Sequence, residues 1–381
     1  MQKTNERIPL LDILRGFAIL GTLGTNIWIF AHLGDISYLF TIDHAIWWES
    51  VQDFLRLVVL FLVNGKLLGL LTMMFGVGLE LKYQQSLRKG TAWPGVYLWT
   101  SLFLLMEGLI HFTLVMEYDI LMSYAVTAII VSFIIKGGDK LIKRAMIITG
   151  TFHAVVMLYI LGVSIYFGSG VMLLGDMDYT VSLYQNGTWI EQIQARLENF
   201  LPLRSEAIFV IPMNIFLFLA GIRLMRSGSF SSDETGKRIR NKMLWIGLGI
   251  GIPLNLLTFV PGGVFDFPVR YLFAPVLSIG YIALIAKMVE INERLWLWSR
   301  FEDIGKMALS CYVTQNILAS FIFYGWGLGL GGKVNSLMTI GIWLLISILQ
   351  MIFAMFWLRR FKFGPMEFAR RYFTGMMIGK K

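Results

Sequence analysis

The stretch that decides the fold is LDILRGFAILGTLGTNIWIF, which runs from Leu11 to Phe30. It is about 20 residues long and mostly apolar, which is the length that a helix needs to cross a bilayer. It nevertheless carries Asp12, Arg15 and Asn26, whose spacings put the three side chains on roughly one helical face. Because a charge at membrane depth is costly unless it is paired or wetted, this face should point at protein or water and mark a functional site.

The rest of the chain has the composition of a multi-pass membrane protein. Of its 381 residues 56% are apolar and 15% are charged, and the mean hydropathy is +0.67. We predict an all-α polytopic protein with ten transmembrane helices. The predicted spans are residues 11–31, 54–81, 95–114, 118–135, 145–166, 207–225, 244–262, 270–290, 306–326 and 336–358. The first run is too long for a signal-peptide core and has no cleavage site, so it should be retained.

The distribution of cations predicts the orientation. Of the 33 Lys and Arg residues, 26 fall in the termini and in alternate loops, four fall in the intervening loops, and Arg15, Arg56 and Lys66 lie within spans. By the positive-inside rule both termini should be cytoplasmic, in a bacterial plasma membrane. The same distribution accounts for the net charge of +9 without a nucleic-acid partner. The single Cys311 excludes an intrachain disulfide, and four scattered histidines argue against a metal site.

A polar stretch after the sixth span divides the chain. We predict an N-terminal six-helix part over residues 1–226, a cytoplasmic linker over 227–243, and a four-helix part over 244–381 that ends in a basic tail. In an outer loop, Trp189 to Leu201 have the apolar spacing of a short amphipathic helix on the membrane surface. The tail mixes cations and aromatic residues from Arg359 to Arg371, which suits an interfacial helix on anionic lipid.

Glu107 and His111 form the second candidate site. They are four residues apart and should share one face of the third span. A carboxylate can fix the tautomer of an imidazole and raise its basicity, which general-base catalysis or a proton relay needs. A structural pair that holds neighbouring helices together is the alternative. His44, in the loop after the first span, is a further candidate base.

Two other polar groups within spans have open interpretations. Lys66 is either the counter-charge of Glu107 or Asp12, or a residue at interface level in a span that is broken at Asn64–Gly65. In the ninth span, Tyr312, Gln315 and Asn316 share one face and should line a cavity or bridge helices.

Several separated motifs resemble the bacterial YeiB family. In chain order they are Arg7-x4-Asp12-x2-Arg15-Gly16 with Asn26, Gly65-Lys66 with Phe75-Gly-Val-Gly78, Gly108-Leu-Ile-His111 with Asp119 and Tyr124, Gly305-Lys-Met-Ala-Leu-Ser with Gln315, Tyr324–Leu330, and Phe363–Glu367. The resemblance covers nearly the whole chain. It implies a multi-pass plasma-membrane protein whose C-terminal part is that family's domain of unknown function. The binding residues that it implies are Asp12, Arg15, Asn26, Lys66, Asp119, Tyr124 and Gln315.

The helix around Asp12-x-x-Arg15-Gly16 is also similar, more distantly, to transmembrane acyltransferases such as the lysosomal heparan-α-glucosaminide N-acetyltransferase. Those enzymes move acetyl from cytoplasmic acetyl-CoA to an acceptor across the membrane and use a histidine on the far side. This resemblance implies acyl-CoA as the donor and a small-molecule, lipid or glycan acceptor. His44 lies in the matching loop, whereas His111 fits the YeiB pattern.

Three functions therefore stay open. In an acyltransferase, Arg15 and Lys66 would hold the anionic donor and His111, oriented by Glu107, would be the base. In a proton-coupled transporter, Glu107 and His111 would relay protons while helices rock. The third function is a non-catalytic scaffold or sensor. The bilayer is the expected partner in every case, and a homo-oligomer stays open.

Overall fold

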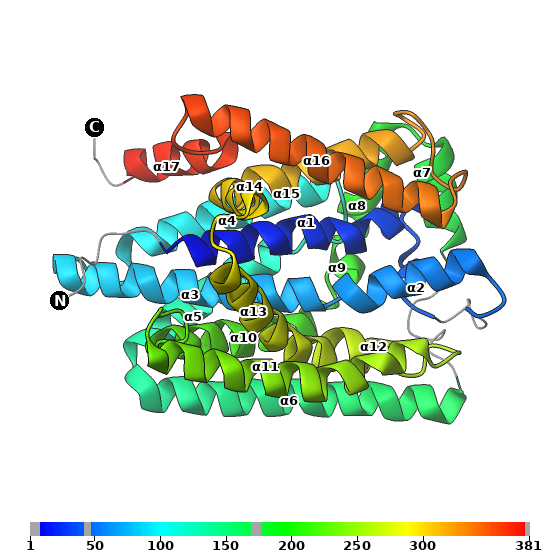
Figure 1. Cartoon of the computed structure of the whole chain (residues 1–381). Coiled ribbons are helices and arrows are strands. Elements are labelled where there is room, and N and C mark those ends of the chain that lie inside the picture. The colour runs from blue at the N-terminus through cyan, green and yellow to red at the C-terminus, as the bar shows by residue number, and fades with distance from the viewer. Residues whose placement is uncertain (1–7, 42–46, 169–176, 378–381) are drawn as a thin grey trace.

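The computed structural model describes residues 8–41, 47–168 and 177–377. Over these ranges the chain forms helices and turns, without a strand, and the long helices lie along one common direction (Figure 1). Eight helical segments are long and apolar enough to cross a membrane, and two shorter apolar helices bring the total to the ten predicted spans. The chain is therefore an all-α polytopic membrane protein, as its sequence predicts.

The ten spans are formed by α1 (Pro9–Ala31), α2 (Val51–Val63) with α3 (Lys66–Lys89), α4 (Gly95–Leu114), α5 (Leu121–Lys136), α6 (Gly138–Phe167), α10 (Ala207–Arg226), α11 (Glu234–Leu256), α12 (Asp266–Pro268) with the π-turn η4 (Val269–Phe273) and α13 (Ala274–Ile291), α15 (Ala308–Phe323) and α16 (Ser336–Arg360). The remaining elements are η1 (Ile36–Leu39), α7 (Asp178–Asn186), α8 (Trp189–Glu198), α9 (Phe200–Leu203), η3 (Leu257–Phe259), α14 (Trp296–Lys306) and α17 (Pro365–Met377).

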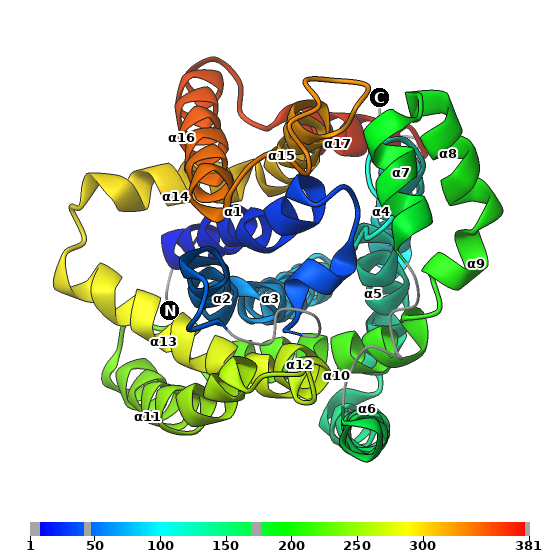
Figure 2. The ribbon, with the colours of Figure 1, turned by 90° about the vertical axis from the view of Figure 1, so that its right-hand side faces the viewer.

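Helices α1 and α3 form the centre of the bundle, and the others surround them (Figure 2). Their central place explains why α1 tolerates polar side chains: Asp12 is only 1% exposed and faces protein. The peripheral helix α6 exposes large apolar side chains such as Ile148, Tyr159 and Tyr166. An outer ring of apolar side chains is what a lipid solvent requires.

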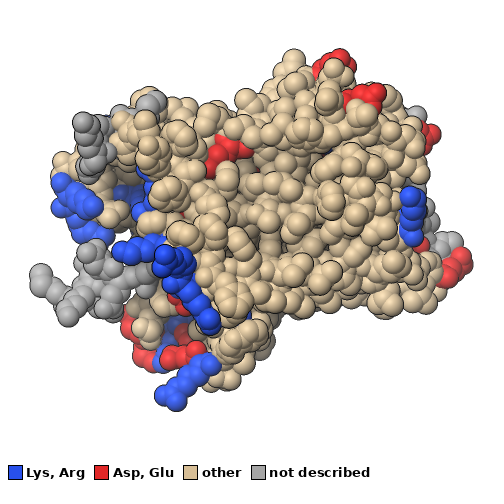
Figure 3. Space-filling view, turned by 90° about the horizontal axis from the view of Figure 1, so that it is seen from above, with Lys and Arg blue, Asp and Glu red and all other residues tan. Residues whose placement is uncertain are grey.

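Charged side chains gather at the ends of the bundle. Lys and Arg are concentrated at one end of the face that Figure 3 shows, and most of the surface between the ends carries no charge. We call this the basic end: α3, α5, α10 and α16 finish there, and α17 lies against it (Figure 1). Helices α7 and α8 lie at the opposite end, which we call the far end. Placing the basic end in the cytoplasm remains a prediction from the positive-inside rule.

The second span is broken, as one of the two interpretations of Lys66 expects. Gly65 has a φ of +75°, and a Cβ there would lie 2.3 Å from the carbonyl oxygen of Arg270, so the break favours glycine. Lys66 then starts α3 and is buried, with its Nζ 3.5 Å from the carbonyl oxygen of Leu60. It forms no ion pair with a described residue. The expectation that it balances Glu107 or Asp12 is therefore wrong.

The predicted linker is shorter than residues 227–243. Helix α11 already begins at Glu234, because the side chain of Asp233 accepts a hydrogen bond from the backbone N of Gly236 at 2.8 Å and caps its first turn. The connection is thus confined to residues 227–233. The two predicted parts also pack together, since α1 contacts α14, α15 and α16.

Helix α14 was not predicted from the sequence, and it packs closely on α1. A Cβ at Gly16 would lie 1.9 Å from the carbonyl oxygen of Phe301, and one at Gly305 would lie 1.9 Å from that of Asp12. The two backbones can approach this closely only because both positions lack a side chain.

Gly16→Ala is therefore expected to destabilise the protein. The added methyl group must push α14 away from α1, which should lower the free energy of unfolding by about 1–3 kcal/mol. Gly341→Ala in α16 is the control, because a Cβ there meets open space. Denaturant titration of the purified protein in detergent measures both. Equal stability of the two variants would contradict the packing argument.

Candidate functional site

A cavity of about 670 Å³ enters the bundle from the basic end. Helices α1, α3, α4, α5, α14, α15 and α17 contribute to its walls. Cations dominate its charged lining, and they are Arg15, Lys82, Arg88, Lys306, Arg370 and Arg371. Among the described residues of the lining, the one carboxylate is Glu367, which accepts hydrogen bonds from the backbone N of Leu309 at 2.8 Å and from Ser310 Oγ at 2.5 Å. Because Glu367 is already bonded at the start of α15, the cavity favours an anionic ligand.

Polarity changes with depth in this cavity. On α3, Lys82, Gln85 and Arg88 line its outer part, whereas Leu71, Met74 and Phe75 line it further from the basic end. Along α1 and α4 the lining likewise changes from polar side chains near the basic end to apolar side chains deeper in the cavity. The deepest lining residues include Ile120, Tyr124 and Tyr312. A ligand with an anionic head and a less polar arm would match this lining, and the volume lies within the usual range for small-molecule sites.

A second cavity, of about 60 Å³, lies on the far-end side of the first. Its polar lining consists of Thr22, Thr25, Asn26, Tyr118, Glu206, Arg270 and Tyr271. On α1 the large cavity reaches Ile19 and the small one begins at Thr22, a rise of about 4.5 Å. Ile120 lines both cavities. The partition between them is therefore about one helical turn thick.

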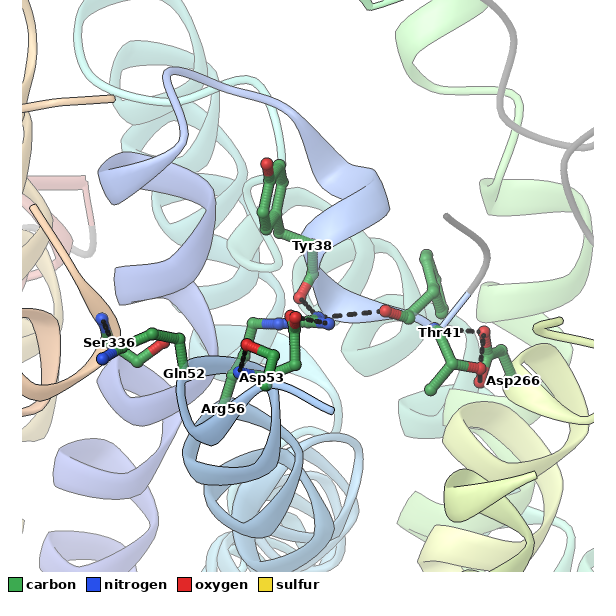
Figure 4. Close-up of polar contacts among 9 residues, drawn as sticks. Tyr38, Thr41, Gln52, Asp53, Arg56, Asp266 and Ser336 are labelled. Carbon is green, nitrogen blue, oxygen red and sulfur yellow. Dashed lines mark hydrogen bonds and ion pairs between the residues drawn. The ribbon is translucent and has the colours of Figure 1, made fainter. Parts of the chain in front are cut away.

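The loop after α1 contributes Ile36 to the wall of the small cavity and is held in place by buried ionic groups. Arg56 is 1% exposed and donates to the carbonyl oxygens of Tyr38 at 2.7 Å and Phe40 at 3.0 Å (Figure 4). Asp266 accepts a hydrogen bond from the backbone N of Thr41 at 2.6 Å (Figure 4). These contacts tie the loop to α2 and α12, so Ile36 of this loop keeps its place in the cavity wall.

The partition carries a chain of buried polar side chains. Asn26 Nδ2 donates to Asn316 Oδ1 at 3.4 Å, and Asn316 Nδ2 lies 3.2 Å from His111 Nε2. On the other side of the ring, His111 Nδ1 lies 3.0 Å from Asp119 Oδ1, and both residues are almost completely buried. A carboxylate beside Nδ1 favours the tautomer with its proton there, which leaves Nε2 as the basic atom. The arrangement suits a general base.

Asp119, rather than Glu107, lies beside His111. Asp119 belongs to the turn between α4 and α5, and its Oδ2 also accepts a hydrogen bond from the backbone N of Met122 at 3.1 Å. Both side-chain oxygens of Glu107 are buried without a hydrogen-bond partner in the described part of the chain. The expectation that Glu107 orients His111 is therefore wrong, because helical spacing shows which residues share a face but not what the next turn brings to it.

Other predicted site residues lie on the large cavity. Arg15 lines it and forms the expected ion pair with Asp12, at 3.3 Å. Tyr124 also lines it, with its hydroxyl 2.7 Å from Thr72 Oγ1. Lys66 lines neither cavity. His44 lies outside the described residues.

The ninth span divides its polar side chains between two neighbours. Gln315 Nε2 donates to the carbonyl oxygen of Ile19 at 3.3 Å and so bridges α15 to α1. Asn316 also contacts α1, through Asn26, and Tyr312 and Asn316 both lie beside His111 of α4. These side chains therefore bridge helices, which is one of the two predicted roles.

Helices α7 to α9 clamp the turn that carries Asp119, and the sequence did not reveal this. Arg204 donates to the carbonyl oxygens of Asp119, at 2.9 Å, and of Glu117. Tyr184 donates to the Glu117 carboxylate, from which Arg196 Nε lies 3.5 Å. Burial, together with the negative charge of Glu117, raises the pKa of Tyr184 well above its ordinary value, so the phenol stays a donor. Arg196 and Arg204 are the two cations of an otherwise cation-poor loop, and this isolation was the feature of the sequence that could have indicated buried ionic contacts here.

The predicted amphipathic helix over Trp189–Leu201 is present but divided. It ends at Glu198 and the short α9 follows. Its buried side chains are Gln192 and Arg196, whereas Ile190 and Leu197 are exposed. An apolar outer face suits contact with the membrane surface, while the polar face holds the turn.

Comparison with known proteins gives relatives along the whole chain. Residues 224–377 match the family described as "Protein of unknown function (DUF418)". The chain is 28% identical over 400 residues to the uncharacterized protein YxaH of Bacillus subtilis (strain 168), covering 99% of this chain and 97% of that protein. It is 28% identical over 399 residues to the uncharacterized protein YeiB of Escherichia coli (strain K12), covering 97% and 96%. No solved structure matches.

Proposed function

Because the chain resembles YeiB along nearly its whole length, and because a cationic cavity and a smaller far-side cavity lie about one helical turn apart beside the His111–Asp119 pair, we propose that it is a transmembrane acyltransferase. The donor would be acyl-CoA, which enters the large cavity from the basic end. The acceptor would be a hydroxyl or amine compound that reaches the partition from the far end. The observation that carries the proposal is the one-turn partition with the His111–Asp119 pair inside it.

The lining of the large cavity suits the proposed donor. Coenzyme A carries several phosphate oxygens at one end and a less polar arm that ends in the thioester. Arg and Lys are the side chains that bind phosphate groups best, and six of them line the cavity. The less polar arm would extend along Leu71, Met74 and Phe75 toward the partition.

The His111–Asp119 pair supports a direct transfer step. His111 Nε2 would remove the proton from the acceptor hydroxyl or amine as the acceptor's oxygen or nitrogen attacks the thioester carbon. The C–S bond would then break, and the imidazolium would return the proton to the thiolate, which leaves as the free thiol of coenzyme A. Asp119 would stabilise the imidazolium between these steps. In this structure the side-chain amide of Asn316 contacts Nε2, so the acceptor would have to displace this amide to reach the base.

The proposal includes a location and an orientation. We infer a bacterial plasma membrane with the basic end and both termini in the cytoplasm, which the concentration of cations at that end supports. Cytoplasmic acyl-CoA would then have direct access to the large cavity. Exposed aromatic residues on α17, including Phe368 and Tyr372, support contact of this helix with lipid at the inner surface.

Membrane vesicles test the proposed function. Inside-out vesicles that contain the protein should transfer label from [1-¹⁴C]acetyl-CoA, added outside, to material in the lumen. Right-side-out vesicles should not, because the donor cannot cross the membrane. Vesicles without the protein set the background. Absence of protein-dependent labelling, or equal labelling from both orientations, would contradict the proposal.

Proton-coupled transport is the second candidate, and Glu107 is the observation in its favour. Its buried oxygens have no hydrogen-bond partner among the described residues, and it lies one turn from His111. A carboxylate in that position can take up and release a proton beside a histidine. A transporter should accumulate its cargo in vesicles in response to a pH gradient without changing the cargo covalently.

A further inference from the structure

Tyr312 lies at the inner limit of the large cavity, beside the base. It lines this cavity from α15, one turn nearer the basic end than Asn316. Its ring centroid is 5.2 Å from that of His111, and the residue is 1% exposed. A donor that entered from the basic end would therefore meet Tyr312 directly before the imidazole.

Among the described residues, the hydroxyl proton of Tyr312 has no acceptor. The phenol oxygen lies near the backbone of Ile120 and the side chain of Asn316, but neither makes a well-aligned hydrogen bond with it. Tyr124, on the same cavity, differs in this respect, because its hydroxyl lies 2.7 Å from Thr72 Oγ1. A buried phenol whose proton has no acceptor is costly, and such groups in native proteins need an explanation. Because Tyr312 lines the inner end of the cavity, a ligand bound there can supply the missing acceptor.

We propose that the Tyr312 hydroxyl binds the carbonyl oxygen of the acyl donor and stabilises the oxyanion that forms there. This inference rests on the proposed acyl transfer. When the acceptor attacks the thioester carbon, the carbonyl π electrons move to oxygen, and the phenol donates a hydrogen bond to the resulting negative charge. As the C–S bond breaks, the electron pair on oxygen re-forms the C=O bond and the negative charge leaves on the sulfur, which His111 protonates. The phenol keeps its proton, since His111 carries the transferred one.

The position of Tyr312 separates its role from that of His111. Asn316 and Tyr312 are four residues apart on one face of α15, so the same helix presents one to the base and the other to the cavity. A reacting carbon between them would have its oxygen near the phenol and its attacking partner near Nε2. Such a division between a base and an oxyanion donor is what acyl transfer requires.

Tyr312→Phe in the full-length protein tests the inference, because it removes the hydroxyl and keeps the ring. The vesicle transfer rate from acetyl-CoA is expected to fall by about 10²–10³-fold. Binding of coenzyme A, which lacks the acyl carbonyl, should stay unchanged and shows that the variant is folded. Tyr281→Phe on α13 removes a phenol that bonds the carbonyl oxygen of Leu62 and should keep the wild-type rate.

Infrared difference spectra provide a readout that does not depend on turnover. With [1-¹³C]acetyl-CoA bound, the carbonyl band should lie at lower frequency in the wild-type protein than in Tyr312→Phe, because the hydrogen bond weakens the C=O bond. If the variant binds coenzyme A but keeps both the rate and the band position of the wild type, the role of Tyr312 is overturned. If the wild type itself neither binds coenzyme A nor transfers label, the acyltransferase proposal fails, and this inference fails with it.

Discussion

His111→Ala is expected to abolish acyl transfer in inside-out vesicles, with a loss of about 10²–10⁴-fold, the range for a general base. Among the described residues, no second imidazole lies beside Asp119 to take the acceptor's proton in place of His111. The variant should still bind coenzyme A, because the cations of the large cavity lie nearer the basic end.

A matched histidine controls for the loss of a buried imidazole. His153 on α6 is also buried and bridges the carbonyl oxygens of Phe209 at 3.0 Å and Tyr271 at 2.9 Å. His153→Ala should lower the stability of the protein but should retain transfer per folded molecule. A His111→Ala protein that binds coenzyme A and transfers label at the wild-type rate would rule out His111 as the base.

The second large effect is expected at the rim of the large cavity. Lys82→Ala combined with Arg370→Ala removes two of its six lining cations, one from α3 and one from α17. A hydrogen bond to a charged group contributes about 1.5–3 kcal/mol, so losing even one contact from each side chain should weaken coenzyme A binding by at least about 10²-fold. Calorimetric titration with coenzyme A in detergent measures the change, and the affinity of the wild type should fall as salt is added.

Arg359→Ala with Arg360→Ala is the control for this pair. Both residues are exposed at the basic end, at the finish of α16, and neither lines the cavity. If their removal weakens binding as much as the cavity pair does, general attraction by the basic end, rather than a built site, would account for the affinity.

Local spacing predicted those parts of the site that lie on one helix. The Asp12–Arg15 ion pair follows from a spacing of three residues, and the ten spans follow from apolar runs of sufficient length. The chain of polar contacts from Asn26 through Asn316 and His111 to Asp119 does not follow from local spacing. It requires α1, α4, α15 and the turn before α5 to meet in space. Glu107 and Asp119 are both acids near His111 in sequence, and only the geometry of that turn distinguishes them.

The same limit applies to the tail and to the far-end helices. Aromatic residues and cations from Arg359 to Arg371 predict an interfacial helix, and α17 has this character. The sequence could not show that Glu367 ties α17 to the start of α15, so that Arg370 and Arg371 wall the cavity. Likewise, the periodicity of Trp189–Leu201 predicts a surface helix but is silent on the buried contact of Arg196 with Glu117.

The thinness of the partition has an electrical consequence. Water and ions that fill the cavities on its two sides would confine most of the transmembrane voltage to about one helical turn at His111, instead of spreading it across the whole bilayer. Moving one elementary charge through a drop of 100 mV takes about 2.3 kcal/mol, a factor of roughly 50 in an equilibrium. An energised cell would thus bias every charge-carrying step at this layer, and a de-energised cell would remove that bias.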